Sequence, residues 1–247
     1  MSIQDSFISH LIELRDRLLR AIVAVLIVLA CIAPWASKIY QLLAAPMLAK
    51  LPAGGHMLAT SVTTPFFVPL KVAALAAFVV ALPYVLFQAW AFVAPGLYVR
   101  EKKLVGPLIV ATTVLFIIGM AFAYFLVFPV VFGFMAGVSP EGVTFAPDIE
   151  QYLNFVITMF LAFGVTFEVP IVVILLVRMG IVDIAKLKEI RPYVIVGAFV
   201  IAAIFTPPDV VSQLLLAIPM CVLYELGILI ARFMGRGDVA VAPEKTL

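Results

Sequence analysis

The sequence contains little charge and little cysteine. Charged residues make up 12% of its 247 residues, two residues are cysteine, and 65% are hydrophobic. Soluble domains have about a quarter charged and about half apolar residues, so the composition excludes an ordinary soluble fold and indicates a polytopic membrane protein. The mean hydropathy of +1.23 agrees with this class. Cys31 and Cys221 lie far apart in apolar segments, a pattern that favours buried free thiols over a disulfide framework.

Catalytic and metal-binding motifs are also missing. The sequence has no G-x-S-x-G, H-E-x-x-H or phosphate-loop pattern, and the polar residues of its apolar segments form no recognisable nucleophile–base pair. His10 and His56 have no metal-ligand partner at a workable spacing. Many nucleic-acid-binding surfaces have blocks of basic residues interleaved with aromatic residues, and this sequence has no such block. We therefore expect no enzymatic activity, no cofactor, no metal site and no nucleic-acid partner.

Six apolar segments predict an all-α membrane protein with six transmembrane helices, in a single domain over residues 1–236 with a flexible cytoplasmic tail at 237–247. The segments cover about 18–36, 70–93, 107–133, 153–177, 192–205 and 210–233. The first is too long for a cleavable signal peptide, so we expect it to stay as a membrane helix. The fifth would rise only about 20 Å as a helix, against a hydrocarbon core of about 30 Å. Pro207 and Pro208 separate it from the sixth, so the two should form a hairpin that barely crosses the bilayer.

Basic residues are distributed unevenly between the two sides of these segments. Thirteen of the sixteen Lys and Arg residues lie on one side, and only Lys38, Lys50 and Lys71 lie on the other. Because cytoplasmic loops carry the excess of basic residues, both termini are predicted to be cytoplasmic. On the outer side, a short apolar–polar stretch near 39–48 predicts an interfacial helix within a structured cap.

A charged helical face precedes the first apolar segment, in the stretch His10-Leu-Ile-Glu-Leu-Arg-Asp-Arg17. His10, Glu13 and Arg17 recur at steps of three and four and therefore share one face of a helix with Arg20. A carboxylate held among arginines at the end of a membrane helix is placed to meet a cationic ligand. Glu13 is therefore the first candidate binding residue.

A second acidic residue, Glu101, follows the second apolar segment and has three basic neighbours. Pro95-Gly96 should end the second helix, because this dipeptide is a strong helix breaker. The basic residues fit an ordinary loop that faces lipid headgroups, whereas an acid there would be repelled by anionic lipid. Two acids on the same side of the membrane, Glu13 and Glu101, therefore begin to indicate a binding site.

Glu168 lies in the middle third of the fourth apolar segment. A charge at that depth costs about 2.5–3.5 kcal/mol on insertion scales, and such residues usually mark functional sites. The functional interpretation is an inward-facing acid on a hydrated concave face. The alternative is an acid satisfied by Thr166, a backbone carbonyl or a neighbouring helix. Pro170 is expected to kink this helix.

Three polar residues near the last two segments have structural explanations as well. Glu225 lies about two turns before Arg232, which suggests an interfacial acid beside a basic residue. Thr206 and Gln213 lie near the outer end of the predicted hairpin. They should form hydrogen bonds across helices, either within this chain or to the membrane span of a partner.

Six stretches, taken in order, resemble the TatC family of the twin-arginine protein translocase. They extend from residue 10 to about 225, and together they are far more specific than any one of them. The matching stretches are His10 to Arg17, Pro46, Ser61-Val-Thr-Thr-Pro-Phe-Phe67, Phe92-Val-Ala-Pro-Gly-Leu-Tyr98 with Glu101-Lys102, Phe167-Glu-Val-Pro170, and Thr206-Pro-Pro-Asp209 through Gln213.

The resemblance implies a concave, glove-like six-helix protein with short fifth and sixth helices. It also implies a receptor for signal peptides with two adjacent arginines, carried by folded cargo that is exported across the bacterial cytoplasmic (inner) membrane at the expense of the proton gradient. Guanidinium groups pair bidentately with carboxylates, so two adjacent arginines suit two separated acids. The residues expected at the signal-peptide site are Glu13, Arg15, Arg17, Phe92, Glu101 and Lys102.

The resemblance implies further roles elsewhere in the chain. Pro46 matches a functionally sensitive proline of the outer loop, and Glu168 matches an acid on the concave side. The single-span subunits TatB and TatA would dock near the hairpin, at Thr206, Asp209 and Gln213. The chain is therefore expected to form an oligomer with these partners, surrounded by membrane lipid.

Two functional hypotheses from different classes remain open at this point. The first is a non-enzymatic receptor and core subunit of a protein translocase, based on Glu13, Glu101 and the resemblance. The second is a proton-coupled small-solute transporter that uses Glu168 as a relay. Composition alone does not distinguish them. A membrane enzyme, the third interpretation, lacks a catalytic constellation.

Overall fold

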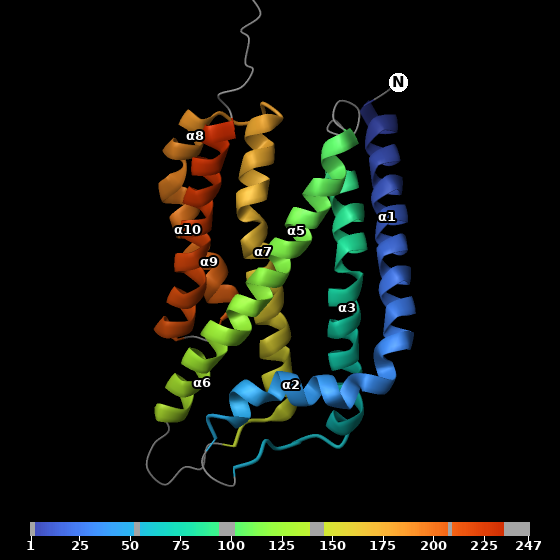
Figure 1. Cartoon of the computed structure of the whole chain (residues 1–247), viewed down its shortest axis with the longest axis vertical. Coiled ribbons are helices and arrows are strands. Elements are labelled where there is room, and N and C mark those ends of the chain that lie inside the picture. Colours follow the sequence, from blue (N-terminus) through green and yellow to red (C-terminus); the bar gives the residue numbers. More distant parts are fainter. Residues whose placement is uncertain (1–2, 52–54, 94–101, 139–145, 207–208, 235–247) are drawn as a thin grey trace, which may run out of the picture. The chain divides into compact units, whose positions relative to one another are not determined.

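The computed structural model describes residues 3–51, 55–93, 102–138, 146–206 and 209–234, and these are almost entirely helical (Figure 1). A single isolated β-bridge within these ranges joins Leu58 and Asp148. The predicted all-α class is confirmed. The α-helices are α1 (Ile3–Ile32), α2 (Ala36–Leu48), α3 (Thr64–Val93), α5 (Lys102–Phe122), α6 (Phe128–Gly137), α7 (Ile149–Arg178), α8 (Ile184–Glu189), α9 (Arg191–Phe205) and α10 (Val210–Met234).

Five stretches of the described residues are long and apolar enough to cross a membrane, and α9 is a shorter apolar helix. With 15 residues, α9 rises about 22 Å, so the prediction of a short fifth helix is confirmed. The sixth helix is not short, and that prediction is wrong. Its apolar stretch of 24 residues rises about 36 Å. The stretch is helical because its apolar residues continue without a break, and Asp209 caps the first turn, where the Ser212 N–H donates to Asp209 Oδ1 at 2.7 Å.

The chain divides into two compact units, residues 1–164 and 165–247, and the two halves of α7 belong to different units. The first unit contains α1, which joins the charged entry segment to the first apolar segment in one continuous helix. A short 3-10 turn at Ala33–Trp35 follows, and α2 then runs crosswise to α1 and α3 (Figure 1). The helix predicted near 39–48 is confirmed as α2.

The core of the first unit is built from aromatic rings and from two glycines. Phe128 packs against Phe132 at 5.5 Å and against Phe160 at 5.3 Å between ring centroids. A Cβ atom at Gly119 would lie 2.5 Å from the backbone oxygen of Phe163, and one at Gly164 would overlap the Phe116 ring. Glycine is therefore required where α5 crosses α7, as at many close helix crossings in membranes.

The second unit packs α8, α9 and α10 around the second half of α7. Val173, Leu187, Tyr224 and Ile228 form a buried cluster, and the Tyr224 hydroxyl donates to the Leu187 carbonyl at 2.8 Å. Glu225 accepts from Arg191 of α9 at 2.6 Å. Its partner is therefore not Arg232, because the antiparallel packing of α9 and α10 brings residues far apart in sequence together.

The two cysteines are free, but they are not both buried. Cys31 is exposed and Cys221 is partly buried, so the prediction of buried thiols is wrong for Cys31. The physical reason is that an apolar residue of a membrane helix can face lipid as readily as protein, so hydropathy does not predict burial.

Candidate functional site

The candidate site lies at the N-terminal end of α1 and the C-terminal end of α3, within the first unit. Its central group is the Glu13 carboxylate, which is 40% exposed. Arg17, one turn along α1, donates from Nη2 at 2.6 Å and from Nε at 2.9 Å, and both hydrogen bonds end on Glu13 Oε1. The spacing of four residues brings these side chains together on one helical face, as predicted.

The other carboxylate oxygen of Glu13 faces a histidine. His10 Nδ1 lies 4.0 Å from Glu13 Oε2, which is beyond hydrogen-bond distance. The His10 ring stacks on Phe92 of α3, with ring centroids 4.3 Å apart and planes inclined by 17°. The His10 side chain therefore lies between Glu13 and Phe92, two residues predicted to belong to one site.

A second contact between α1 and α3 involves Gln88. Arg17 Nη1 donates to Gln88 Oε1 at 3.5 Å, and the Gln88 residue is only 5% exposed. Gln88 lies one turn before Phe92 on α3. Arg17 therefore bridges Glu13 and Gln88, and through Arg17 the carboxylate on α1 is tied to α3.

Sequence reasoning missed Gln88 and assigned His10 no role. A signal for Gln88 was present, because an amide within an otherwise apolar segment needs a hydrogen-bond partner. Its position four residues before Phe92 places both side chains on one face of a helix. The stacking of His10 on Phe92 had no signal in the sequence, since it depends on how α1 packs against α3.

Of the other predicted site residues, Arg15 lies apart from this cluster, and two more fall outside the described part of the structure. Arg15 pairs with its neighbour Asp16 at 2.8 Å, and its side chain is 67% exposed. It lies on a different face of α1 from Glu13, because residues two apart on a helix do not face each other. Glu101 lies outside the described residues. Lys102 begins α5, and its side chain is likewise outside the described part of the structure.

Glu168 lies in the second unit, in the second half of α7, and is 8% exposed. Neither of its carboxylate oxygens has a hydrogen-bond partner among the described residues. The alternative in which Thr166 or a neighbouring carbonyl satisfies this acid is therefore wrong for the part of the chain that is described. A buried acid without a partner among these residues is unusual, which keeps Glu168 as a candidate functional residue, although the predicted exposure to a hydrated face is not seen.

The polar residues of the α9–α10 hairpin form their hydrogen bonds largely within the hairpin itself. The Thr206 hydroxyl donates to the Ala202 carbonyl at 2.8 Å. Asp209 caps α10, and Gln213 Nε2 donates to the Phe199 carbonyl of α9 at 3.1 Å. The predicted hydrogen bond across helices is confirmed for Gln213, whereas Thr206 bonds within its own helix.

Pro46 lies inside α2, where its ring nitrogen cannot donate a hydrogen bond. In a regular helix the residue at position 46 would donate to the carbonyl of Leu42, four residues earlier. The Tyr124 hydroxyl donates to this carbonyl instead, at 2.8 Å. Tyr124 therefore compensates for the proline, and it is another residue that sequence reasoning missed.

Comparison with known proteins shows which family the chain is similar to. The sequence profile of the family described as Sec-independent protein translocase protein (TatC) matches residues 9–219. The chain belongs to the TatC family. The matched range includes every predicted site residue, from Glu13 to Gln213.

Relatives and solved structures agree with this TatC assignment over nearly the full chain. The TatC protein of Escherichia coli K12 is 51% identical over 96% of this chain and 93% of its own length. That of Haemophilus influenzae is 53% identical over 92% and 88%, respectively. A crystal structure described as the twin arginine translocase receptor TatC superposes with a TM-score of 0.80 and 37% identity, over 92% of this chain and 100% of that one.

TatC membership establishes the broad role of the chain. It is an integral membrane protein and a component of the Sec-independent, twin-arginine protein translocase, and so takes part in protein transport. This role favours the translocase hypothesis over the small-solute transporter. A translocase component also functions with other parts of the same translocation system.

Proposed function

We propose that this TatC-family chain is the receptor and core subunit of the translocase, and that it binds twin-arginine signal peptides of folded cargo. The observation that carries the proposal is the Glu13 carboxylate, which is partly exposed and held by Arg17 beside the His10–Phe92 stack. Because both bonds from Arg17 end on Oε1, Oε2 keeps acceptor capacity for an incoming guanidinium. Glu101 would supply the second carboxylate, with Arg15 and Lys102 at the margin of the site.

The chemistry of this site suits reversible recognition. A hydrogen bond to a charged group contributes about 1.5–3 kcal/mol net. Two such contacts, less the cost of ordering a flexible peptide, allow roughly micromolar affinity. A receptor that must release its cargo requires affinity of this order. Phe92 would add an apolar surface next to the charged groups.

The proposal includes an orientation and a driving force. The excess of basic residues on one side supports cytoplasmic termini in the bacterial inner membrane, which would place Glu13 on the side where folded cargo is made. The proton gradient would drive export. The burial of Glu168, with no hydrogen-bond partner among the described residues, supports a functional role for this acid, and we propose that it lies along the path of the signal peptide.

Partner subunits TatB and TatA would dock at the α9–α10 hairpin. One face of α9 exposes apolar side chains at helical spacing, namely Tyr193, Val196, Val200 and Ile204. A single-span partner could cover this face next to Thr206, Asp209 and Gln213. Disulfide crosslinking from Gln213→Cys, in a chain whose Cys31 and Cys221 are replaced by serine, tests this part of the proposal.

The receptor proposal is tested by the affinity of a fluorescent twin-arginine peptide for the purified chain. Glu13→Ala should weaken binding about tenfold or more, since it removes a charge-assisted contact, and a peptide with two lysines should bind the wild type more weakly. Glu189→Ala is the matched control, because Glu189 is an exposed acid paired with Lys186 at 3.0 Å on α8. Undiminished binding after replacement of both Glu13 and Glu101 would contradict the proposal.

A further inference from the structure

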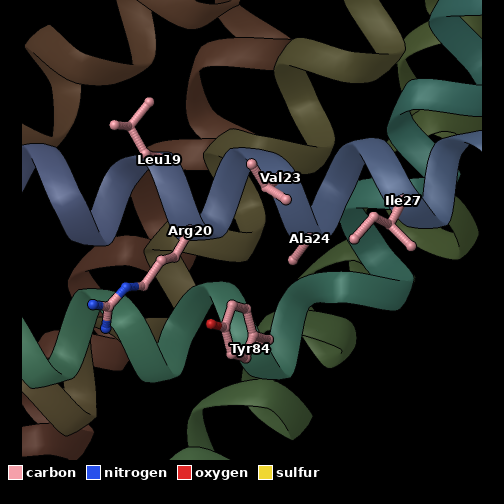
Figure 2. A pocket seen from close by; sticks show the side chains of 6 residues that line it. All are labelled: Leu19, Arg20, Val23, Ala24, Ile27 and Tyr84. Atoms are coloured by element: carbon pink, nitrogen blue, oxygen red, sulfur yellow. The ribbon is translucent and has the colours of Figure 1, made fainter.

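A groove runs between α1 and α3 in the first unit, next to the candidate site but separate from it. It has a volume of about 380 Å³. Figure 2 shows its lining, with Arg20 extending from α1 toward α3 and Tyr84 lying on α3. The residues that line it are Leu19, Arg20, Val23, Ala24, Ile27 and Tyr84.

We propose that this groove binds one anionic phospholipid, with the phosphate at Arg20 and an acyl chain along Val23, Ala24 and Ile27. The walls are apolar and open, since Leu19 is 52%, Val23 52% and Ile27 61% exposed. In a membrane protein such a surface is covered by lipid or by another helix. Only 6% of the most apolar window of this first span is buried, a smaller share than in the other spans of the described residues.

The charge of the groove selects the headgroup. Arg20 makes no hydrogen bond or ion pair with any other residue that the structure describes. Asp16, one turn earlier on α1, pairs with Arg15 at 2.8 Å instead. No carboxylate lines the groove, so it offers nothing to the ammonium of a zwitterionic headgroup. A guanidinium that no acid among the described residues pairs with favours a phosphate that carries net negative charge.

The position of Arg20 matches the depth of a phosphate group. Arg20 is the third residue of the predicted apolar segment 18–36, so its Cα lies about 3 Å inside the end of that segment. Its long side chain can extend to the headgroup level while the methylene groups stay in apolar surroundings. The apolar lining continues to Ile27, about 10 Å deeper along α1, which is the direction an acyl chain takes.

Tyr84 completes the headgroup end of the groove. In Figure 2 its hydroxyl is turned to the same end of the groove as the Arg20 guanidinium, while its ring borders the apolar part. A tyrosine hydroxyl can donate to a phosphate or ester oxygen.

Lipid binding can be measured by native mass spectrometry of the delipidated chain in a mild detergent. The probes are dioleoyl phosphatidylglycerol and dioleoyl phosphatidylethanolamine. Wild type should bind one phosphatidylglycerol about fivefold more tightly than phosphatidylethanolamine, the factor that one basic residue contributes near an anionic membrane surface. Arg20→Gln should abolish this preference, and Arg20→Lys should keep part of it.

Two further variants distinguish lipid binding in the groove from a general attraction of anionic lipid to an exposed positive charge. Ala24→Trp should fill the groove and prevent phosphatidylglycerol binding although Arg20 is retained. Arg232→Gln is the matched control, because Arg232 is an exposed arginine in the last turn of α10 and lies outside the groove. It should leave the single tight site intact. Thermal unfolding without lipid should be unchanged in the Arg20 variants and in the control.

Several outcomes would overturn the proposal. One is retention of the wild-type lipid preference by Arg20→Gln or Ala24→Trp. Another is an equal loss in Arg232→Gln, which would show a general effect of positive charge. Competition by glycerol 3-phosphate at the same concentration as the lipid would show that the acyl groove plays no part. Dissociation of a lipid-free dimer by Ala24→Trp would show that a second copy of the chain covers this surface instead.

Discussion

At the scale of single residues, the polar side chains of this protein differ in the partners that hold them. Glu13 is fixed by Arg17 and stays partly exposed, whereas Glu168 is buried and has no hydrogen-bond partner among the described residues. Leu42 offers a carbonyl that Pro46 cannot satisfy and Tyr124 does. These local differences decide which substitutions the chain tolerates.

Glu168→Gln should insert and fold like wild type, whereas Glu168→Lys should impair export. Glutamine is neutral and similar in size to glutamic acid, so it fits the buried position. Lysine would place a cation there without an acid to pair with it, which is costly in a buried environment. Export of a twin-arginine reporter, normalised to the amount of inserted chain, checks this. Full activity of Glu168→Lys would argue against an inward-facing role.

Tyr124→Phe should lower the free energy of unfolding by about 0.5–1.5 kcal/mol, because the Leu42 carbonyl loses its donor. In the Pro46→Ala background the same change should cost less, since alanine restores the backbone N–H that a helix directs at this carbonyl. A double-mutant cycle in detergent measures this coupling. Equal costs in both backgrounds would show that Tyr124 does not compensate for Pro46.

At the scale of elements, the fold depends on how helices cross and how they begin. The close approach of α5 and α7 requires glycine at positions 119 and 164. The start of α7 is organised by Asp148, whose Oδ1 accepts from the N–H groups of Glu150 and Gln151 at 2.9 Å each. Its Oδ2 accepts from the Thr60 hydroxyl at 2.6 Å, which ties the segment before α3 to α7.

Gly119→Ala should destabilise the chain by about 1–3 kcal/mol, the usual cost of overpacking. The new methyl group would meet the backbone of Phe163, which cannot move aside as a side chain could. Gly106→Ala in the same helix is the control, because nothing lies within 4 Å of a Cβ atom there. Thermal unfolding of both variants is the measurement, and equal melting temperatures would contradict the role of this crossing.

Acid should weaken the cap at Asp148. The Thr60 hydroxyl and the backbone N–H of Gln151 hold the pKa of Asp148 below its ordinary value of 3.8. A carboxyl whose pKa is lower in the folded state stabilises the fold at higher pH. This contribution is lost as the pH falls below 3.8 through the folded pKa. Asp148→Asn should therefore show a shallower loss of stability than wild type below that pH, and parallel curves would contradict the prediction.

At the scale of the whole molecule, the proposed functional residues come from both compact units. The Glu13 site belongs to the first unit, and Glu168 and the α9–α10 hairpin belong to the second. The TatC profile extends across both. The proposed receptor role rests on three features: a candidate binding site at one end of α1 and α3, a buried acid within a span, and a short helix with an exposed apolar face.

The predictable part of this protein follows from local chemistry. Long apolar segments form helices in a membrane whatever their neighbours are, so every predicted span from 18–36 to 210–233 lies in helical structure, although α1 begins 15 residues before the first predicted span. Helical spacing alone brought Glu13 and Arg17 together. The length of the sixth helix follows from its apolar residues, whereas its predicted shortness rested on the family resemblance.

Sequence alone therefore determined the membrane class, the helical elements and the acid at the end of the first span. Only the tertiary structure decided four side-chain contacts. They are the stacking of His10 on Phe92, the hydrogen bond from Arg17 to Gln88, the ion pair of Arg191 with Glu225, and the hydrogen bond from Tyr124 to the Leu42 carbonyl. Each of these contacts joins residues at least 34 positions apart. Such contacts depend on how helices pack, and a hydropathy pattern carries no information about which side chains meet at a helix interface.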